Sequence, residues 1–251
     1  MGAIGPNTPA GIAPTAPLTP NALPLAPSRG RGSQGIPLRG ETTVLRWLVI
    51  YYSQTGQTKR ALDEVTTALV AADHAVTWRA IEPVEPYPFP WPQRPFWGVA
   101  PLCKRAVGCA IHPLNLPPAD EVDAILLGAQ PWFLAPAPPV MGFINSAAAE
   151  ILRDKPVFPV ITCRAAWRQA YRILALTIHA HGGRIVSRLI LKDRAPTPIN
   201  ILTTVHYLWR GREIHDAPLG RIWPRFGVDD WGWRQAQHFG KGLVKLGANK
   251  L

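Results

Sequence analysis

The stretch Trp47–Tyr52 (WLVIYY), followed directly by Ser53–Thr58 (SQTGQT), decides the fold of this 251-residue chain. The apolar run has the composition of a buried strand, and the amphipathic sequence after Thr58 predicts a helix. A loop between a strand and a helix offers unpaired N–H groups at the positive end of the helix dipole, and Gly56 lets the backbone approach an anion closely. The stretch therefore predicts a strand, a phosphate-binding loop and a helix.

The residues of this loop indicate which kind of phosphate compound it could bind. No lysine follows Gly56 as a Walker loop requires, so a nucleoside triphosphate with magnesium is not expected. The hydroxyls of Ser53, Thr55 and Thr58 suit a single phosphate monoester, such as that of FMN, held by hydrogen bonds without a cationic side chain. The alternative is that these residues only cap the helix.

The first forty residues differ in composition from the rest of the chain. They contain eight prolines and three arginines but no Asp or Glu. Such a segment buries too little apolar surface to offset the entropy of ordering it. We expect a disordered extension over residues 1–42, or a start site placed too far upstream, and a folded domain over residues 43–251. No secretory signal is visible.

The chain is strongly basic, with a formal charge of +11, of which the three N-terminal arginines supply three and residues 41–251 supply +8. The Lys and Arg residues are scattered and match no nucleic-acid-binding motif, so nucleic acid is not an expected partner. Apolar and aromatic residues over Ile199–Arg212 end against Arg210 and Arg212, which suits peripheral contact with an anionic membrane. The run is too short to span a bilayer, and a partly buried loop or short helix is the alternative.

Cys103, Cys109 and Cys163 are odd in number and form no CxxC pair. A reduced, cytoplasmic protein with no structural metal is expected. His179 and His181 are two residues apart and do not share a helix face, so they do not predict a metal pair. Any of the cysteines could be a nucleophile, but the sequence identifies no partner for one.

Strands and helices alternate along the chain. The patterns predict helices over 58–72, 143–152, 167–178 and from Asp229 or Asp230 to Leu246, and strands over 47–52, 75–81, 122–128, 157–162 and 184–191. Two long insertions interrupt them, a Pro-rich and aromatic flap over Glu82–Pro118 and the segment between the last strand and the last helix. Five strands alternating with helices predict an α/β, doubly wound parallel sheet with helices on both faces.

In such sheets ligands bind beyond the carboxyl ends of the strands, where the winding direction reverses. Three loops are expected to meet there. They follow the first, third and fourth strands and comprise Ser53–Thr58, residues 129–140 and Cys163–Trp167.

The phosphate loop and the strand rhythm resemble the flavodoxin-like family over residues 45–247. The resemblance implies a five-stranded sheet of order 2-1-3-4-5 and FMN as the cofactor. It places the phosphate on Ser53, Gln54, Thr55, Gly56, Gln57 and Thr58, and the flavin ring between two loops. The first ring loop is Gln130, Pro131, Trp132 and Phe133; the second is Cys163, Arg164, Ala165, Ala166 and Trp167, where the usual Gly and Asp are missing.

Longer strings also resemble the flavodoxin-like proteins labelled dialkylresorcinol condensing enzymes. These strings are TVLRWLVIYYSQTGQT, PYPFPWP, LLGAQPWFLAPAPPV, LKDRAPTPIN and PRFGVDD. The chain has no counterpart to the cysteine and histidines of a condensing ketosynthase. The resemblance therefore implies an FMN-dependent oxidoreductase beside a ketosynthase partner, which oxidises a dialkylcyclohexanedione to the aromatic resorcinol.

Oxidative aromatisation needs a hydride acceptor, a base and an apolar cavity for the alkyl chains. Asp193 or His206 could be the catalytic base, and Arg164 and Arg194 could hold the substrate's oxygens. The alternative for Asp193 is a structural ion pair with Arg194. The expected cavity walls, which ordinary core packing could also explain, are Trp91, Phe96, Trp97, Trp132 and Phe133.

Other functions stay open. A flavodoxin-type electron carrier usually has an acidic docking surface, which the +8 charge disfavours. A general NAD(P)H-dependent quinone reductase is a second alternative, and an interaction module without flavin is a third.

Overall fold

The computed structural model describes residues 44–164, 167–193, 195–216 and 220–248. The predicted extension 1–42 and the residues Arg194, Ala165 and Ala166 lie outside these ranges. The described part of the chain forms one α/β domain. Its central sheet is parallel throughout and contains β1 (Arg46–Tyr51), β2 (Ala75–Ala80), β3 (Ala124–Ala129), β6 (Pro156–Cys163), β7 (Arg184–Ile185) and β8 (Leu189–Lys192).

The order of the strands confirms the predicted topology. The sheet runs β2-β1-β3-β6-β7, with β8 also paired to β6, which is the flavodoxin-like order 2-1-3-4-5 when β7 and β8 count as one broken strand. The winding direction reverses between β1 and β3, whose loops therefore lie side by side at the carboxyl end of the sheet.

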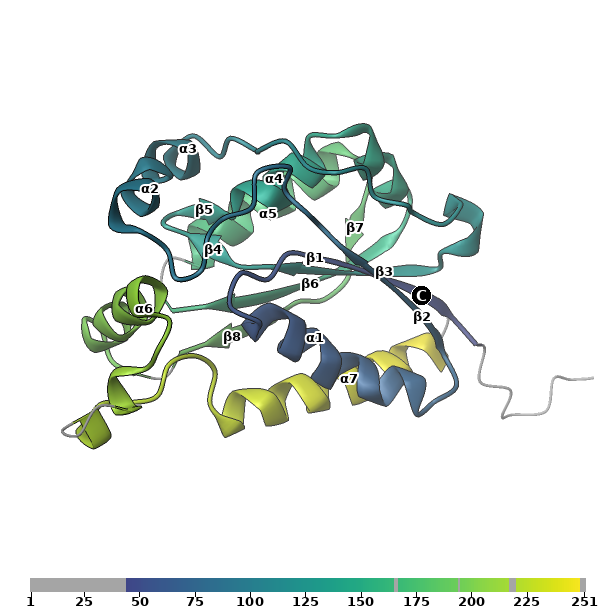
Figure 1. Ribbon diagram of the computed structural model, residues 1–251. Helices are drawn as coiled ribbons and strands as arrows, with labels where there is room; N and C mark the ends of the chain where they lie inside the picture. Colours follow the sequence, from purple (N-terminus) through teal and green to yellow (C-terminus); the bar gives the residue numbers. More distant parts are fainter. Residues whose placement is uncertain (1–43, 165–166, 194, 217–219, 249–251) are drawn as a thin grey trace, which may run out of the picture. The chain divides into compact units, whose positions relative to one another are not determined.

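Helices cover both faces of the sheet (Figure 1). On one face lie α1 (Gln57–Val70) and α7 (Asp230–Ala248), and on the other lie α4 (Pro138–Ile144) and α5 (Trp167–Ala180). Alternate residues of β1 feed the two cores, because successive side chains of a strand point to opposite faces. Trp47 and Val49 pack beneath α1 and α7, whereas Leu48 and Ile50 pack beneath α4 and α5.

One glycine sets how closely α1 approaches the sheet. A Cβ added to Gly128 of β3 would lie 2.6 Å from Leu62 Cδ1 of α1 and 2.8 Å from Tyr51 Cβ. The missing side chain therefore lets the start of α1, and with it the loop Ser53–Thr58, pack directly against β3.

The last strand differs from the prediction of one continuous strand over 184–191. Val157 pairs with Ile185, but Val160 pairs with Leu189, so the second strand has one more residue than β6 over this interval. An extra residue of this kind is a β-bulge, which interrupts the ladder and separates β7 from β8.

The predicted single helix over 143–152 is also wrong. The chain forms α4 (Pro138–Ile144), breaks at Asn145 and Ser146, and continues as the 3-10 helix η2 (Ala147–Leu152). Ser146 Oγ donates a hydrogen bond to Phe143 O at 2.7 Å, and its backbone is extended. Serine and asparagine offer the backbone such local partners and so favour helix ends over helix interiors.

The two insertions gather at the end of the sheet where the strands end (Figure 1). The flap contains two short helices as well as irregular chain, α2 (Gln93–Gly98) and α3 (Ala100–Lys104), and the 3-10 helix η1 (Ala119–Glu121) follows it. The second insertion contains α6 (Ile199–Arg210), η3 (Ile214–Asp216) and η4 (Gly220–Ile222). The short hairpin β4 (Pro131–Trp132) and β5 (Ala135–Pro136) follows β3. None of the described helices combines the length and apolarity needed to cross a membrane.

Candidate functional site

The loop Ser53–Thr58 forms the predicted turn between β1 and α1. Gly56 has φ +77°, a left-handed conformation that favours glycine, and α1 begins at the next residue. Ser53 Oγ accepts a hydrogen bond from Lys59 N at 3.2 Å. Within the described residues, the N–H groups of Thr55, Gly56, Gln57 and Thr58 have no acceptor, as expected of a first helical turn. The loop therefore presents several free donors at the positive end of α1.

Thr58 in the first turn of α1 is bonded to the loop after β3 and to the end of β6. Its hydroxyl donates to Gln130 Oε1 at 3.1 Å and accepts from Thr162 Oγ1 at 2.8 Å, and its side chain is buried. The Nε2 of Gln130 is buried without a hydrogen-bond partner among the described residues. Thr58 is thus turned into the protein, whereas Thr55 is half-buried at the surface of the loop.

Gln54 connects the same loop to the flap. Its Nε2 donates to Tyr87 O at 3.1 Å and to Pro88 O at 3.2 Å, and its Oε1 accepts from the hydroxyl of Tyr52. The flap is therefore anchored over the carboxyl end of β1.

A cavity of about 460 Å³ opens beside the loop. Its volume lies within the range of roughly 300–1,000 Å³ that is usual for small-molecule sites. The five aromatic residues expected to wall a cavity all line it, and Gln54, Thr55, Gln57 and Thr58 line the side next to the loop. The aromatic residues contact one another edge to face or tilted, with ring centroids 4.8 Å apart for Trp91 and Trp132 and 5.6 Å apart for Phe96 and Phe133.

Helix α6 closes another side of the cavity, a role that the sequence interpretation missed. Ile201, Val205 and Leu208 line the cavity together with Thr204. Leu208 O accepts a hydrogen bond from Trp91 N at 2.6 Å, which joins α6 to the flap. The i, i+4, i+7 spacing of the three aliphatic residues marks a helix face, and this signal was present in the sequence.

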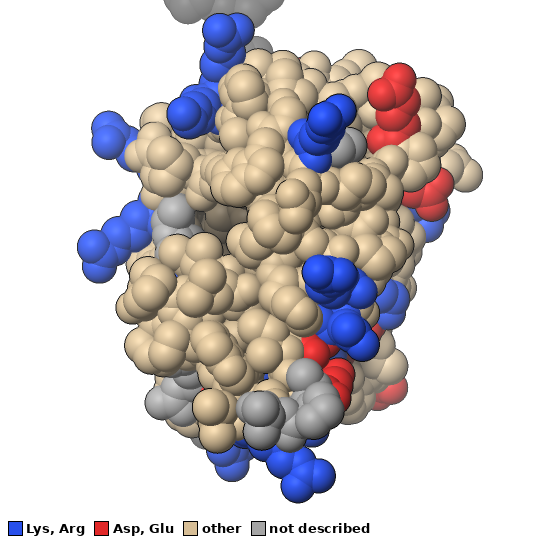
Figure 2. Space-filling view, turned by 60° about the vertical axis from the view of Figure 1, so that its left-hand side comes forward, with Lys and Arg blue, Asp and Glu red and all other residues tan. Residues whose placement is uncertain are grey.

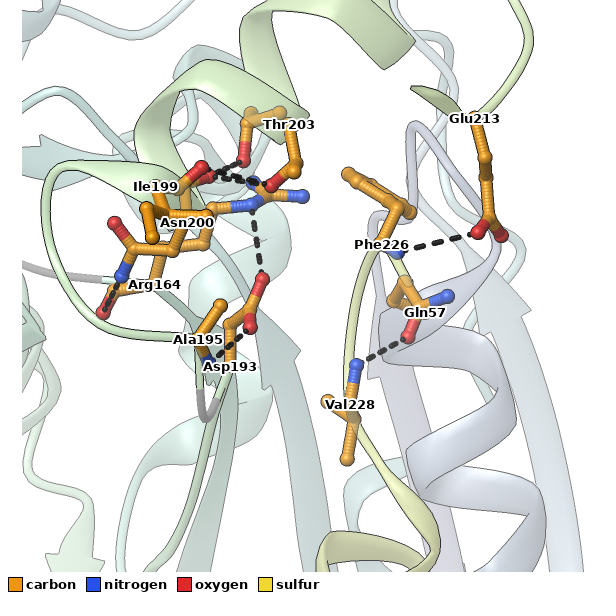
Figure 3. Close-up of polar contacts among 11 residues, drawn as sticks. Gln57, Arg164, Asp193, Ala195, Ile199, Asn200, Thr203, Glu213, Phe226 and Val228 are labelled. Atoms are coloured by element: carbon orange, nitrogen blue, oxygen red, sulfur yellow. Dashed lines mark hydrogen bonds and ion pairs between the residues drawn. The ribbon is translucent and has the colours of Figure 1, made fainter. Parts of the chain in front are cut away.

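One polar pair interrupts the apolar lining. Arg164 follows β6 and Asp193 follows β8, and the guanidinium Nε lies 3.7 Å from the carboxylate Oδ2 (Figure 3). Asp193 Oδ1 accepts from Ala195 N at 2.9 Å. The guanidinium carbon lies 4.3 Å from the ring centroid of Phe226, a cation–π contact that holds it from the other side.

Burial controls the protonation of this pair. The separation of 3.7 Å is too long for a hydrogen bond, and Arg164 Nε and Asp193 Oδ2 have no hydrogen-bond partner among the described residues. Burial raises the pKa of Asp193 above its ordinary value, in spite of the neighbouring arginine. Burial also lowers the pKa of Arg164 to about 10.

Gly227 and Val228 lie against Gln57 at the start of α1, a contact that the sequence did not indicate. Gln57 Oε1 accepts a hydrogen bond from Val228 N at 3.1 Å (Figure 3). Gly227 has φ +97°, and a Cβ there would lie within 2.7 Å of three side-chain atoms of Gln57. Gly227 and Val228 therefore complete the cavity wall next to the first turn of α1.

Several predicted site residues lie outside the cavity lining. Ser53 and Gly56 shape the loop without lining the cavity, and neither Trp167 nor His206 is among the lining residues. His206 Nδ1 is buried without a hydrogen-bond partner among the described residues. Arg194, the second candidate for holding an oxygen, is not described. The structure therefore brings Asp193 and Arg164, but not His206, to the cavity.

The cysteines are poorly suited to nucleophilic chemistry. Burial raises the pKa of Cys163, which lines the cavity, to about 12 and that of Cys103 also to about 12. Burial raises the pKa of Cys109 as well. Since the thiolate is the reactive form, none of the three is activated at neutral pH.

No family model and no curated protein matches the sequence. Several solved structures match. A flavoprotein from Lactobacillus acidophilus NCFM, in complex with FMN, is 16% identical with a TM-score of 0.48, and the match covers 59% of this chain and 93% of that chain. The two-electron reduced flavodoxin of Megasphaera elsdenii is 15% identical with a TM-score of 0.42, covering 79% and 98%. Rubredoxin oxygen:oxidoreductase from Desulfovibrio gigas is 10% identical with a TM-score of 0.45, covering 84% and 38%. The fold assignment rests on the strand order described above.

Proposed function

We propose that the protein is an FMN-binding oxidoreductase that acts on an apolar substrate. The observation that carries the proposal is the position of the loop Ser53–Thr58: its free N–H groups lie at the switch point of a doubly wound sheet and open on an aromatic cavity. Phosphate sites commonly use such loops, and ligands of these sheets commonly lie at this edge.

The residues present fit this cofactor. The N–H groups of Thr55 to Thr58 and the Thr55 hydroxyl would hold the phosphate without a cationic side chain. Flat aromatic walls at Trp91 and Trp132 suit a ring system, and the unpartnered Nε2 of Gln130 is a donor suited to a polar edge of that ring. When bound, FMN supplies a hydride acceptor that the side chains of the protein lack.

The side chains around the cavity suit the remaining demands of a two-hydrogen oxidation. Asp193 would accept the proton that leaves with the hydride, and burial raises its pKa in the direction that makes a carboxylate a stronger base. Arg164 would hold a substrate oxygen that gains negative charge. The flap and α6 would exclude water from the cavity, which favours substrate oxidation over electron transfer at an exposed flavin edge.

For the substrate we propose a dialkylcyclohexanedione, supplied by a ketosynthase. Removal of one hydride and one proton from adjacent ring carbons creates a double bond, and tautomerisation then gives the dialkylresorcinol. The apolar lining supports alkyl substituents, and Arg164 supports a ring that carries oxygens.

Anaerobic incubation of the FMN-loaded protein with a dialkylcyclohexanedione tests this proposal. The expected result is loss of the oxidised flavin absorbance together with formation of one resorcinol per flavin. The Asp193→Asn protein should keep FMN and react much more slowly. Flavin reduction by NADPH with none by the dione would contradict the proposal and favour a general quinone reductase.

A further inference from the structure

The mouth of the cavity carries apolar side chains that remain exposed. Trp97 of α2 and Ile201 of α6 both line the cavity and are 55% and 44% exposed. Beside them, Leu134 of the β4–β5 hairpin and Leu202 of α6 are 51% and 52% exposed. We call these four residues the rim. The three elements that carry them are in contact, because the ring centroid of Phe96 lies 5.6 Å from that of Phe133 and 6.0 Å from that of Trp209.

The charges on the segments around the rim have one sign. The segments 86–119, 129–149 and 195–212 contain no Asp or Glu. Within these segments lie five exposed basic side chains, none of which forms an ion pair with another described residue: Arg94, Lys104, Arg105, Arg210 and Arg212. The carboxylate of Glu213, the next acid along the chain, accepts a hydrogen bond from Phe226 N at 3.4 Å.

Figure 2 looks toward the end of the domain that carries α2, α3 and α6. A broad uncharged surface is bordered and interrupted by Lys and Arg, and Asp and Glu appear at the right and in the lower middle of the view. An exposed apolar group of this kind, bordered by cations, suits a partner that is both apolar and anionic.

We propose that the rim docks on an anionic lipid bilayer. The four rim side chains would enter the interfacial layer, where tryptophan and aliphatic residues are favoured, and the five basic side chains would face acidic headgroups. Because Trp97 and Ile201 also line the cavity, docking points the cavity mouth at the membrane. An apolar ligand then passes between the bilayer and the cavity without crossing water.

A bilayer accounts for both features of the surface with one partner. Its headgroups supply the negative charge, and its acyl chains supply the apolar contact directly beneath them. An acidic protein would match the charges, but would have to bring a complementary apolar patch to the same place. The docking proposal does not depend on FMN, because the rim and the basic residues lie outside the phosphate loop.

Vesicle flotation with the full chain tests the proposal. Vesicles of phosphatidylcholine with phosphatidylserine are compared with vesicles of phosphatidylcholine alone, at low and high salt. Arg210→Glu/Arg212→Glu removes two basic residues near the rim, and Lys241→Glu/Lys245→Glu makes the same charge change on two exposed residues of α7. Leu202→Asp is matched by Leu176→Asp, which alters a leucine of α5 that is 63% exposed. Circular dichroism checks that each variant is folded.

The wild type should float with the acidic vesicles and lose binding at high salt. Each basic residue near an anionic surface contributes about fivefold to affinity, so the double arginine variant should bind at least about 25-fold more weakly. Leu202→Asp should weaken binding by roughly tenfold, as expected for loss of one buried leucine. Both control variants should bind like the wild type. Failure of the wild type to bind acidic vesicles, equal binding to neutral vesicles, or equal losses in the α7 and α5 controls would overturn the proposal.

Discussion

Arg164 and Asp193 face each other across the carboxyl ends of β6 and β8, with guanidinium Nε and carboxylate Oδ2 3.7 Å apart. The two positions are held by the backbone, because Asp193 N donates to Cys163 O at 2.9 Å. The side chain of Asp193 is 4% exposed and that of Arg164 is 25% exposed. A buried pair at this distance, without a direct hydrogen bond, retains capacity to bind a further polar group.

Because the pKa of Asp193 is raised, we predict how the free energy of unfolding depends on pH. The folded state holds the Asp193 proton more tightly than the unfolded state, so the free energy of unfolding falls as pH rises from the ordinary aspartate pKa, about 3.9, through the raised pKa. The Asp193→Asn protein has no carboxyl group at this position, so its free energy of unfolding does not fall for this reason. The stability of the wild type minus that of the variant should therefore decrease with rising pH across this window, as measured by urea unfolding at several pH values.

Asp123 supplies a control, because its contribution to stability should change with pH in the opposite direction to that of Asp193. Its hydrogen bond with Arg46 lowers the pKa of Asp123, so its contribution to stability is present above the ordinary pKa and is lost as pH falls through the lowered one. The corresponding difference for Asp123→Asn should increase with rising pH. Equal slopes for the two variants would contradict the assigned pKa directions.

Gly128→Ala tests how the phosphate loop is positioned. The new methyl group would lie 2.6 Å from Leu62 Cδ1 and would push α1 away from β3. We expect a loss of about 1–3 kcal/mol in the free energy of unfolding, as is usual for an overpacked core. Gly242→Ala in α7 is the matched control, because a Cβ there meets no atom within 4 Å. This control should be stabilised by up to about 1 kcal/mol, and equal effects of the two substitutions would refute the packing argument.

Trp97→Ala tests the apolar mouth of the cavity. The side chain lines the cavity but is 55% exposed, so its removal should leave the urea midpoint nearly unchanged. Binding of an alkylresorcinol, measured by fluorescence titration, should weaken roughly 2- to 10-fold, as expected for loss of one aromatic contact. Trp231→Ala, at a 48% exposed tryptophan of α7, should not change this affinity. A large loss of stability in Trp97→Ala would instead assign the residue to the core.

The fold followed from sequence because its signals are local. The apolar run 47–52, the loop Ser53–Thr58 and the helical spacing after it predicted β1 and α1. The alternation of elements predicted a doubly wound parallel sheet, and the resemblance to the flavodoxin-like family implied its strand order. The bulge between β7 and β8 was not predicted, since one extra residue leaves an apolar run unchanged. The break at Ser146 was missed because the apolar spacing continues across it.

The site was only partly predictable, because some of its contacts join residues that are far apart in the sequence. Residues that follow strands, such as Thr58, Gln130 and Arg164, could be placed together once the strands were known. The contact of Gln57 with Val228 joins positions 171 residues apart, and no local pattern indicates it. The sequence left two interpretations of the α6 segment open, peripheral membrane contact or a partly buried loop or short helix. The structure shows a helix whose apolar face lines the cavity and which leaves Ile201 and Leu202 exposed.

The most direct test of the account is a fluorescence titration of the purified protein with FMN and with riboflavin, which lacks the phosphate. We expect FMN to bind and riboflavin to bind about tenfold more weakly for each charge-assisted hydrogen bond that is lost. Thr55→Asp should abolish FMN binding by repulsion, whereas Thr67→Asp, at an exposed threonine farther along α1, should not. A colourless protein that takes up no FMN, or one that binds riboflavin as tightly as FMN, would contradict the phosphate-loop assignment.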